Sequence, residues 1–239
     1  MDTSAVGGAA YPPRSAAQTA ELVRRAVYRH FATSGLQPTR AVLAEQLALD
    51  ARQVDHAFQS LADAHHLVLD PDGSIVLAHP FATRNFGFSV MGAHTLWWGG
   101  CAWDAFAIPH LVAHEPSALV ATTCPACAAP LAWTVQRSGP PDAPGVAHFL
   151  VPVERIWNDV VHACSNQRIF CDTDCVEAWL GRTGHQTGSV FGLDVLWRLA
   201  SRWYEGRLDS PYTRREPSQA RDYFESVGLR GAFWGVPEK

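Results

Sequence analysis

The chain has 239 residues, with 19 Lys and Arg against 23 Asp and Glu, so its formal net charge is -4. Hydrophobic residues make up 47% and charged residues 18%, which is typical of a globular protein and excludes a largely disordered one. No apolar run approaches the roughly 18 residues that a membrane-spanning helix needs, and residues 1–15 lack the basic start and apolar stretch of a signal peptide. We therefore expect a cytoplasmic protein without a membrane partner. The mild acidity also argues against a dedicated nucleic-acid-binding protein.

The N-terminal third carries the pattern of a small helical module. Residues 1–18 are rich in Ala, Gly, Pro and Ser, which predicts a flexible leader. Over residues 19–80, three segments repeat apolar residues at helical spacing, and a strand–turn–strand pattern around Asp70 to Gly73 follows them. Three helices and a hairpin in this order predict a winged-helix-like module.

The charges of this module argue against DNA as its partner. Residues 19–80 contain five arginines and seven acidic residues. The third predicted helix, which would enter the major groove, sets Arg52 against Asp55 and Asp63. Because basic contacts to phosphates supply most non-specific affinity, we favour a packing role over DNA binding.

Residues 81–208 mix strand and helix patterns without a regular alternation. A mainly apolar helix is expected at 101–113, kinked near Pro109, and an amphipathic helix at 189–205. Strand patterns lie at 117–122, 131–135 and 146–151. We therefore predict an α+β fold, in which a mixed or antiparallel sheet core with flanking helices follows the N-terminal module. Residues 209–239 are expected to form a C-terminal extension.

Six cysteines lie in the central part of the chain: Cys101, Cys124, Cys127, Cys164, Cys171 and Cys175. In a reducing compartment, such a set favours metal binding or catalysis over disulfides. Cys124-Pro-Ala-Cys127 and Cys171-x3-Cys175 leave a four-cysteine zinc site open as an alternative, although a CxxxC half-site is the less usual one. Cys164 has no partner in the sequence and is interpreted as structural.

Cys101 and Asp104 are three residues apart on the predicted apolar helix, so their side chains share one face. A carboxyl group near apolar surface has a raised pKa, and this would make Asp104 a proton donor. The alternative, that Cys101 fills the core and Asp104 makes a local cap or pair, stays open. Cys171 follows a strand pattern, and two thiolates from separate elements suit a soft metal such as Hg(II) or Cu(I).

Three segments resemble the organomercurial (alkylmercury) lyase family. Thr95-Leu-Trp-Trp-Gly-Gly-Cys101-Ala-Trp-Asp104-Ala-Phe-Ala-Ile-Pro109 is similar to the family's Cys-x-x-Asp helix. The segment 123–131 resembles the stretch with the family's structural cysteine, and Ile169-Phe170-Cys171 resembles the Phe-Cys that supplies its second catalytic thiol. With the N-terminal module included, the resemblance covers residues 19–206.

The resemblance implies a catalytic triad of Cys101, Asp104 and Cys171. In that family the two cysteines bind the mercury of R–Hg⁺, and the aspartate relays the proton that releases R–H and leaves Hg(II) on the thiols. It implies no organic cofactor, and small thiols or a mercuric reductase as acceptors of the product. Aromatic side chains of the same region are expected to wall the substrate pocket, although such residues are also typical of a core: Trp97, Trp98, Trp103 and Phe106.

Two departures from the family pattern keep a second function open. Asp172-Thr-Asp174-Cys175 follows Cys171 where the family has a different cysteine-containing stretch, and Cys127 is an added thiol. The leading prediction is an organomercurial lyase. The alternative is a lyase-like scaffold that serves as a cysteine-based binding protein for zinc, mercury or copper, or as a metal-responsive regulator.

Overall fold

The computed structural model describes residues 14–238. Most of the predicted leader lies outside these residues. Ser15 already caps the first helix: its hydroxyl accepts a hydrogen bond from the Gln18 backbone N–H, and the Gln18 side chain accepts one from the Ser15 N–H. This capping box starts the helix at Ala16, three residues before the position expected from apolar spacing.

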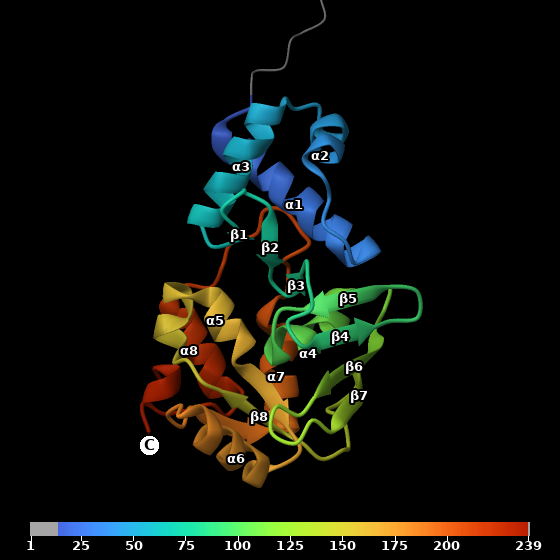
Figure 1. The fold of residues 1–239 in the computed structure, drawn as a ribbon. Coiled ribbons are helices and arrows are strands. Elements are labelled where there is room, and N and C mark those ends of the chain that lie inside the picture. Colours follow the sequence, from blue (N-terminus) through green and yellow to red (C-terminus); the bar gives the residue numbers. More distant parts are fainter. Residues whose placement is uncertain (1–13, 239) are drawn as a thin grey trace, which may run out of the picture.

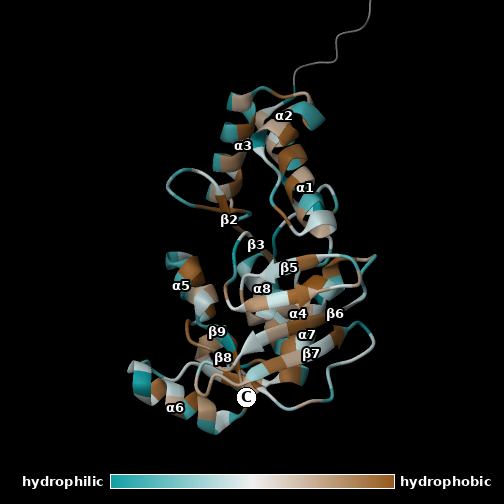
Figure 2. Ribbon diagram, turned by 45° about the vertical axis from the view of Figure 1, so that its right-hand side comes forward, coloured by the Kyte–Doolittle hydropathy of each residue, from teal (hydrophilic) through white to brown (hydrophobic). Residues whose placement is uncertain are grey.

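Three helices and a hairpin open the fold, in the order expected from the sequence. Figure 1 shows the helices at one end of the molecule, and Figure 2 shows hydrophobic and hydrophilic stretches along α1 and α3, as in amphipathic helices. The elements are α1 (Ala16–Ser34), α2 (Arg40–Leu47), α3 (Ala51–Asp63), β1 (Val68–Leu69) and β2 (Ile75–Ala78). The hairpin forms one end of a larger sheet, so these helices are joined directly to the rest of the fold.

Two antiparallel sheets form the centre of the molecule. The larger has the strand order β1-β2-β3-β5-β4-β6-β7, and the smaller has the order β10-β8-β9. The remaining strands are β3 (Phe81–Ala82), β4 (Phe88–Met91), β5 (Leu96–Gly99), β6 (Ser117–Thr123), β7 (Pro130–Gln136), β8 (Val146–Phe149), β9 (Gln167–Phe170) and β10 (Ser189–Gly192). Helices and antiparallel sheets together confirm the predicted α+β class.

The rest of the chain contains a strongly apolar helix, α4, and further helices after it. They are α4 (Ala102–Leu111), η1 (Val153–Asn158), α5 (Val160–Ser165), α6 (Thr173–Thr183), α7 (Leu193–Trp203), α8 (Pro217–Ser226) and η2 (Ala232–Trp234). Every residue of α4 from Ala102 to Pro109 is buried, against α7 and the large sheet. A helix that is apolar on all sides is buried in this way. Its burial also places Asp104, in its first turn, in the interior.

The structure corrects one expectation for the C-terminal part and adds detail to another. Residues 189–192 form β10, which pairs with β8, so the helix expected at 189–205 begins only at Leu193. The sequence repeats apolar residues at helical spacing there, but residues 189–192 pair with β8 instead. Val190 and Phe191 also favour a strand. The C-terminal extension contains α8 and η2, whose Phe224 and Trp234 are buried in the core.

One hydrophobic core runs from the N-terminal helices into the sheets. The rings of Phe31 and Phe81 stack with centroids 5.6 Å apart, and Trp97 Nε1 donates to the Phe31 carbonyl at 2.8 Å. The N-terminal helices are therefore packed onto the sheet that leads into α4. Among the described residues, none of the helices is both long and apolar enough to cross a membrane.

Candidate active site

Cys101 and Asp104 are held at the start of α4 by a tight strand-to-helix turn. Cys101 is the N-cap residue, and its sulfur accepts a hydrogen bond from the Asp104 backbone N–H at 3.4 Å. A Cβ on Gly100 would lie 2.5 Å from Asp104 Oδ2, so only glycine leaves room for that carboxylate. Cys101 and Asp104 are 2% and 1% exposed. Helix spacing and the turn thus place a thiol and a carboxylate together, away from bulk water.

The Asp104 carboxylate has two side-chain partners from distant parts of the chain. His79 Nδ1 lies 2.9 Å from its Oδ2, and the Tyr204 hydroxyl donates to its Oδ1 at 2.5 Å. Burial by itself raises the pKa of Asp104, but the charge of His79 and hydrogen bonds from His79, Tyr204 and Cys101 outweigh it, so the pKa is lowered. The sequence predicts the opposite direction, because the partners of the carboxylate cannot be read from local spacing.

His79 shows the matching shift. Burial lowers the pKa of its imidazole, but the negative charge of Asp104, followed by Cys164, raises it further than burial lowers it. The net pKa of His79 is therefore above its usual value. The two shifts have the directions expected of an ion pair between Asp104 and His79.

Cys164, and not Cys171, is the thiol that meets Cys101. It lies on α5, is 3% exposed, and lines the same cavity as Cys101. One ligand atom from each of His79, Asp104 and Cys164 lies within 4.8 Å of the others. Burial, the contact with Cys164 and the charge of Asp104 raise the pKa of Cys101 far above its usual value, so the resting thiol is protonated.

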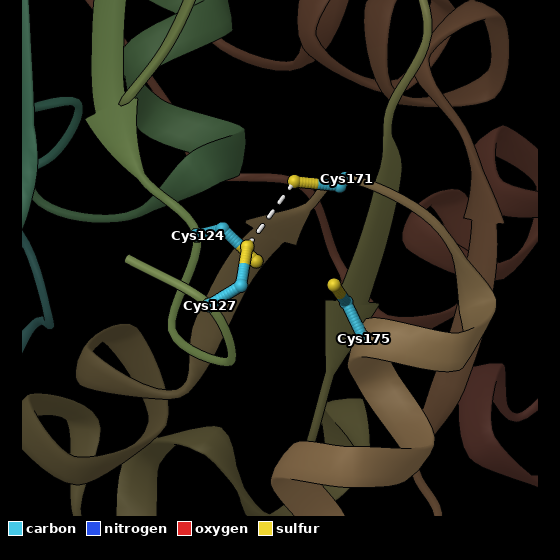
Figure 3. A group of neighbouring side chains, drawn as sticks. All are labelled: Cys124, Cys127, Cys171 and Cys175. Atoms are coloured by element: carbon cyan, nitrogen blue, oxygen red, sulfur yellow. Dashed lines mark hydrogen bonds between the residues drawn. The ribbon is translucent and has the colours of Figure 1, made fainter. Parts of the chain in front are cut away.

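Cys171 belongs to a second cluster. Its sulfur and those of Cys124, Cys127 and Cys175 all lie within 4.8 Å of one another (Figure 3). Cys164 precedes β9 and Cys171 directly follows it, and a four-residue strand spans about 13 Å, so the two thiols are found at opposite ends of that strand. The predicted pairing of Cys101 with Cys171 is corrected accordingly.

The two thiols and the carboxylate line a cavity of about 100 Å³. Trp103, Trp157 and Trp203 form aromatic parts of its wall. Of the four aromatic residues predicted for this purpose, Trp103 alone is among the lining residues. Trp97 and Phe106 are buried in the core, and Trp98 lies in β5 outside the cavity lining. The sequence missed Trp157 and Trp203 because η1 and α7 reach the cavity only through the tertiary fold.

The cavity is rich in positive charge. Arg207, Arg214 and Arg215 line it, and Asp104 is the one carboxylate among its described lining residues. Arg207 is buried and donates to the Tyr28 hydroxyl at 3.0 Å and to the His79 carbonyl at 2.9 Å. Arg207 therefore fixes the segment that carries His79.

This arrangement combines two functions in one enclosed space. Paired thiols are ligands for a soft metal ion. A carboxylate in contact with one of these thiols can accept its proton and pass it on. The site is therefore suited to binding a thiophilic metal together with proton transfer.

Comparisons with known proteins identify a family and a related fold. The family model of alkylmercury lyase, MerB, matches residues 81–205, more than half of the chain. Among solved structures, the crystal structure of the mercury-bound form of MerB2 superposes with a TM-score of 0.58. It is 15% identical in sequence, and the match covers 81% of this chain and 98% of that chain, so this likeness concerns the fold. A comparison with curated proteins gave no match.

Proposed function

Because the chain belongs to the alkylmercury lyase family, as the match over residues 81–205 shows, we propose that it cleaves the carbon–mercury bond of alkyl- and arylmercury compounds by protonolysis. Cys101, Cys164 and Asp104 are the reacting side chains in this proposal. One observation carries it: the two buried thiols and the carboxylate converge on a single cavity. Cys164 replaces Cys171 in the triad that the family resemblance implied.

Mercury capture uses both thiols. A substrate R–Hg–X exchanges its ligand X for the sulfur of one cysteine, and the thiol proton leaves with X as HX. The second thiol then adds to mercury and loses its proton. Asp104 is ionised in the resting site and is hydrogen-bonded to Cys101, so it is placed to accept that proton.

Bond cleavage returns this proton to carbon. Two thiolates on mercury increase the electron density on the carbon that leaves. Because its neighbours lower the pKa of Asp104, its protonated form is a strong acid and transfers the proton to R. The products are R–H and Hg(II) bound to Cys101 and Cys164. The balance is R–Hg–X plus two thiols giving R–H, HX and a mercury dithiolate.

His79 and Tyr204 act on Asp104 and need not touch the substrate. The contact with His79 lowers the pKa of the carboxylate and so favours its ionised form, and the Tyr204 hydroxyl donates to its other oxygen. We assign both as positioning residues. The aromatic wall of Trp103, Trp157 and Trp203 excludes water and accommodates the organic group.

The arginines support a proposal for the partners of the reaction. In the reducing cytoplasm, where we place the enzyme, an organomercurial is carried by a small thiol. A thiol that bears carboxylates is attracted by Arg214 and Arg215 at the cavity. The same thiols, or a mercuric reductase, would accept Hg(II) from the two cysteines.

Release of benzene from phenylmercury tests the proposal. With an excess of a small thiol, the wild-type protein should release many equivalents of benzene per chain, because the thiol removes Hg(II) after each turnover. Asp104→Asn should bind phenylmercury and release none. Tight binding by the wild-type protein without benzene would overturn the proposal in favour of a soft-metal-binding protein.

A further inference from the structure

The thiols of Cys124, Cys127, Cys171 and Cys175 form a cluster that the proposed reaction does not use. In Figure 3 their side chains point toward a common centre. All four sulfurs lie within 4.8 Å of one another, and those of Cys127 and Cys171 are 3.6 Å apart. Cys124 is buried, while Cys127 is exposed and the other two are half-buried. The cluster thus lies near the surface, where a metal ion can enter it.

The first half-site is a tight loop between β6 and β7. Cys124 N donates to the Ala129 carbonyl at 2.9 Å, and Ala128 N donates to the Cys124 carbonyl at 3.0 Å. Ala128 adopts the left-handed conformation, with φ 61°, and this turns the chain back. The turn brings the sulfurs of Cys124 and Cys127 within 4.8 Å of each other.

The second half-site joins a strand to a helix. Cys171 follows β9, and Cys175 lies in the first turn of α6. Asp172 caps this helix by accepting a hydrogen bond from the Cys175 N–H at 2.8 Å, which fixes the spacing of the two cysteines. The sulfurs of Cys127 and Cys171 are 3.6 Å apart, so the two half-sites are already in contact.

The geometry matches zinc in particular. With Zn–S bonds of about 2.3 Å, the sulfurs of a tetrahedral site are about 3.8 Å apart. The 3.6 Å separation and the 4.8 Å limit are consistent with this value. A tetrahedral set of four sulfurs is typical of zinc or iron, whereas magnesium and calcium prefer oxygen ligands. Four protein ligands leave no open position, so the ion would be structural and not catalytic.

The surrounding packing explains why a cross-link is useful here. The cluster belongs to a small hydrophobic core that is separate from the main one. The buried members of this small core are Cys124, Phe170, Val176 and Trp179. Apart from the cysteines, the contact of α6 with the loop includes a hydrogen bond from Arg182 Nη2 to the Pro125 carbonyl at 3.0 Å. A metal ion would fasten the β6–β7 loop to β9 and α6. Cys164 lies close before β9, so this also braces the segment that carries the second reactive thiol.

We propose that Cys124, Cys127, Cys171 and Cys175 bind one structural zinc ion, separate from the mercury site. The full chain should be produced in zinc-supplemented cells and purified with a reductant and without chelator. Elemental analysis should find about one zinc per chain. Zinc-edge X-ray absorption should show four sulfur neighbours at about 2.3 Å. A strong metal chelator should lower the melting temperature of the wild-type protein.

Two double variants remove the same number of thiols from different clusters. Cys127→Ser/Cys175→Ser should contain less than about 0.1 zinc per chain, and chelator should leave its melting temperature unchanged. The matched control, Cys101→Ser/Cys164→Ser, should retain about one zinc per chain. If the first variant does not fold, zinc content and X-ray absorption of the wild-type protein decide the question.

Three results would overturn the zinc site. They are a wild-type protein without bound metal, iron in place of zinc, and zinc retained in full by folded Cys127→Ser/Cys175→Ser. None of these depends on carbon–mercury cleavage. A protein with zinc and without benzene release contradicts the proposed function alone, and a protein with benzene release and without metal contradicts the zinc site alone.

Discussion

Cys164 lies on α5 and Cys101 caps α4, yet the Cys164 thiol is close enough to raise the pKa of the Cys101 thiol. Both thiols are buried and both line the cavity that contains Asp104. In the proposed reaction Cys164 is therefore the partner of Cys101, whereas Cys171 belongs to the separate four-cysteine cluster.

Replacement of Cys164 should therefore abolish turnover. We expect Cys164→Ser to release benzene from phenylmercury at least about 100-fold more slowly than the wild-type protein, since one thiolate on mercury cannot replace two. Cys171→Ser is the informative comparison. Measured in folded protein, as judged by circular dichroism, it should release benzene in a single turnover. A Cys171→Ser variant that is folded but inactive, beside an active Cys164→Ser, would restore the pairing expected from the sequence.

Tyr204 should affect proton transfer by Asp104 and not the binding of mercury. Tyr204→Phe removes the hydroxyl that donates to Asp104 Oδ1, and we expect the protonolysis rate to fall about tenfold, the effect of one charge-assisted hydrogen bond. Because the bond also lowers the pKa of Asp104, the acid limb of the pH–rate profile should move to higher pH. Stoichiometric binding of phenylmercury should be unchanged. An unaltered pH profile would show that the hydroxyl has only a packing role.

The His79–Asp104 pair should give stability a defined pH dependence. The lowered pKa of Asp104 contributes stability above its unfolded value of 3.8, which is lost as pH falls through the folded pKa. The raised pKa of His79 contributes stability below its unfolded value of 6.5, which is lost as pH rises through the folded pKa. The free-energy difference between the wild-type protein and His79→Gln should thus be largest between pH 3.8 and 6.5. Urea unfolding across pH measures it, and a difference that grows above pH 6.5 would contradict the ion pair.

The C-terminal extension should contribute to the stability of the core. Trp234 is 1% exposed, and its Nε1 donates to Ser189 Oγ at 2.9 Å. Trp234→Ala should lower the free energy of unfolding by about 3–5 kcal/mol, the cost of a large buried side chain. Leu36→Ala, at a residue that is 68% exposed, is the control and should change it by less than about 0.5 kcal/mol. Equal effects of the two substitutions would mean that η2 does not pack on the core in solution.

The sequence predicts the parts of this site that depend on local spacing. Cys101 and Asp104 lie close together because Cys101 caps one apolar helix and Asp104 lies in its first turn, and that helix can be predicted from its composition. The paired strands β6 and β7 and the order of the first three helices follow in the same way from periodicity. The division of the chain into separate domains at residue 80 stays a prediction.

The remaining parts depend on contacts between distant segments. His79 and Tyr204 come from two different regions, and nothing near either residue indicates that it contacts Asp104. The direction of the pKa shift of Asp104 follows from these partners, so it could not be predicted from the sequence either. The Phe-Cys resemblance favours Cys171, whereas the structure places Cys164 near Asp104, because the positions of the two ends of β9 are set by the sheet.

The location of the product mercury tests the account most directly. Zinc-loaded protein should be treated with less than one equivalent of phenylmercury, without small thiol, and crystallised, with released benzene measured in the same sample. We predict one mercury peak in the anomalous difference map, between the sulfurs of Cys101 and Cys164, and one benzene for each mercury bound. Mercury found only among Cys124, Cys127, Cys171 and Cys175, or mercury between Cys101 and Cys164 without benzene, would contradict the proposed reaction.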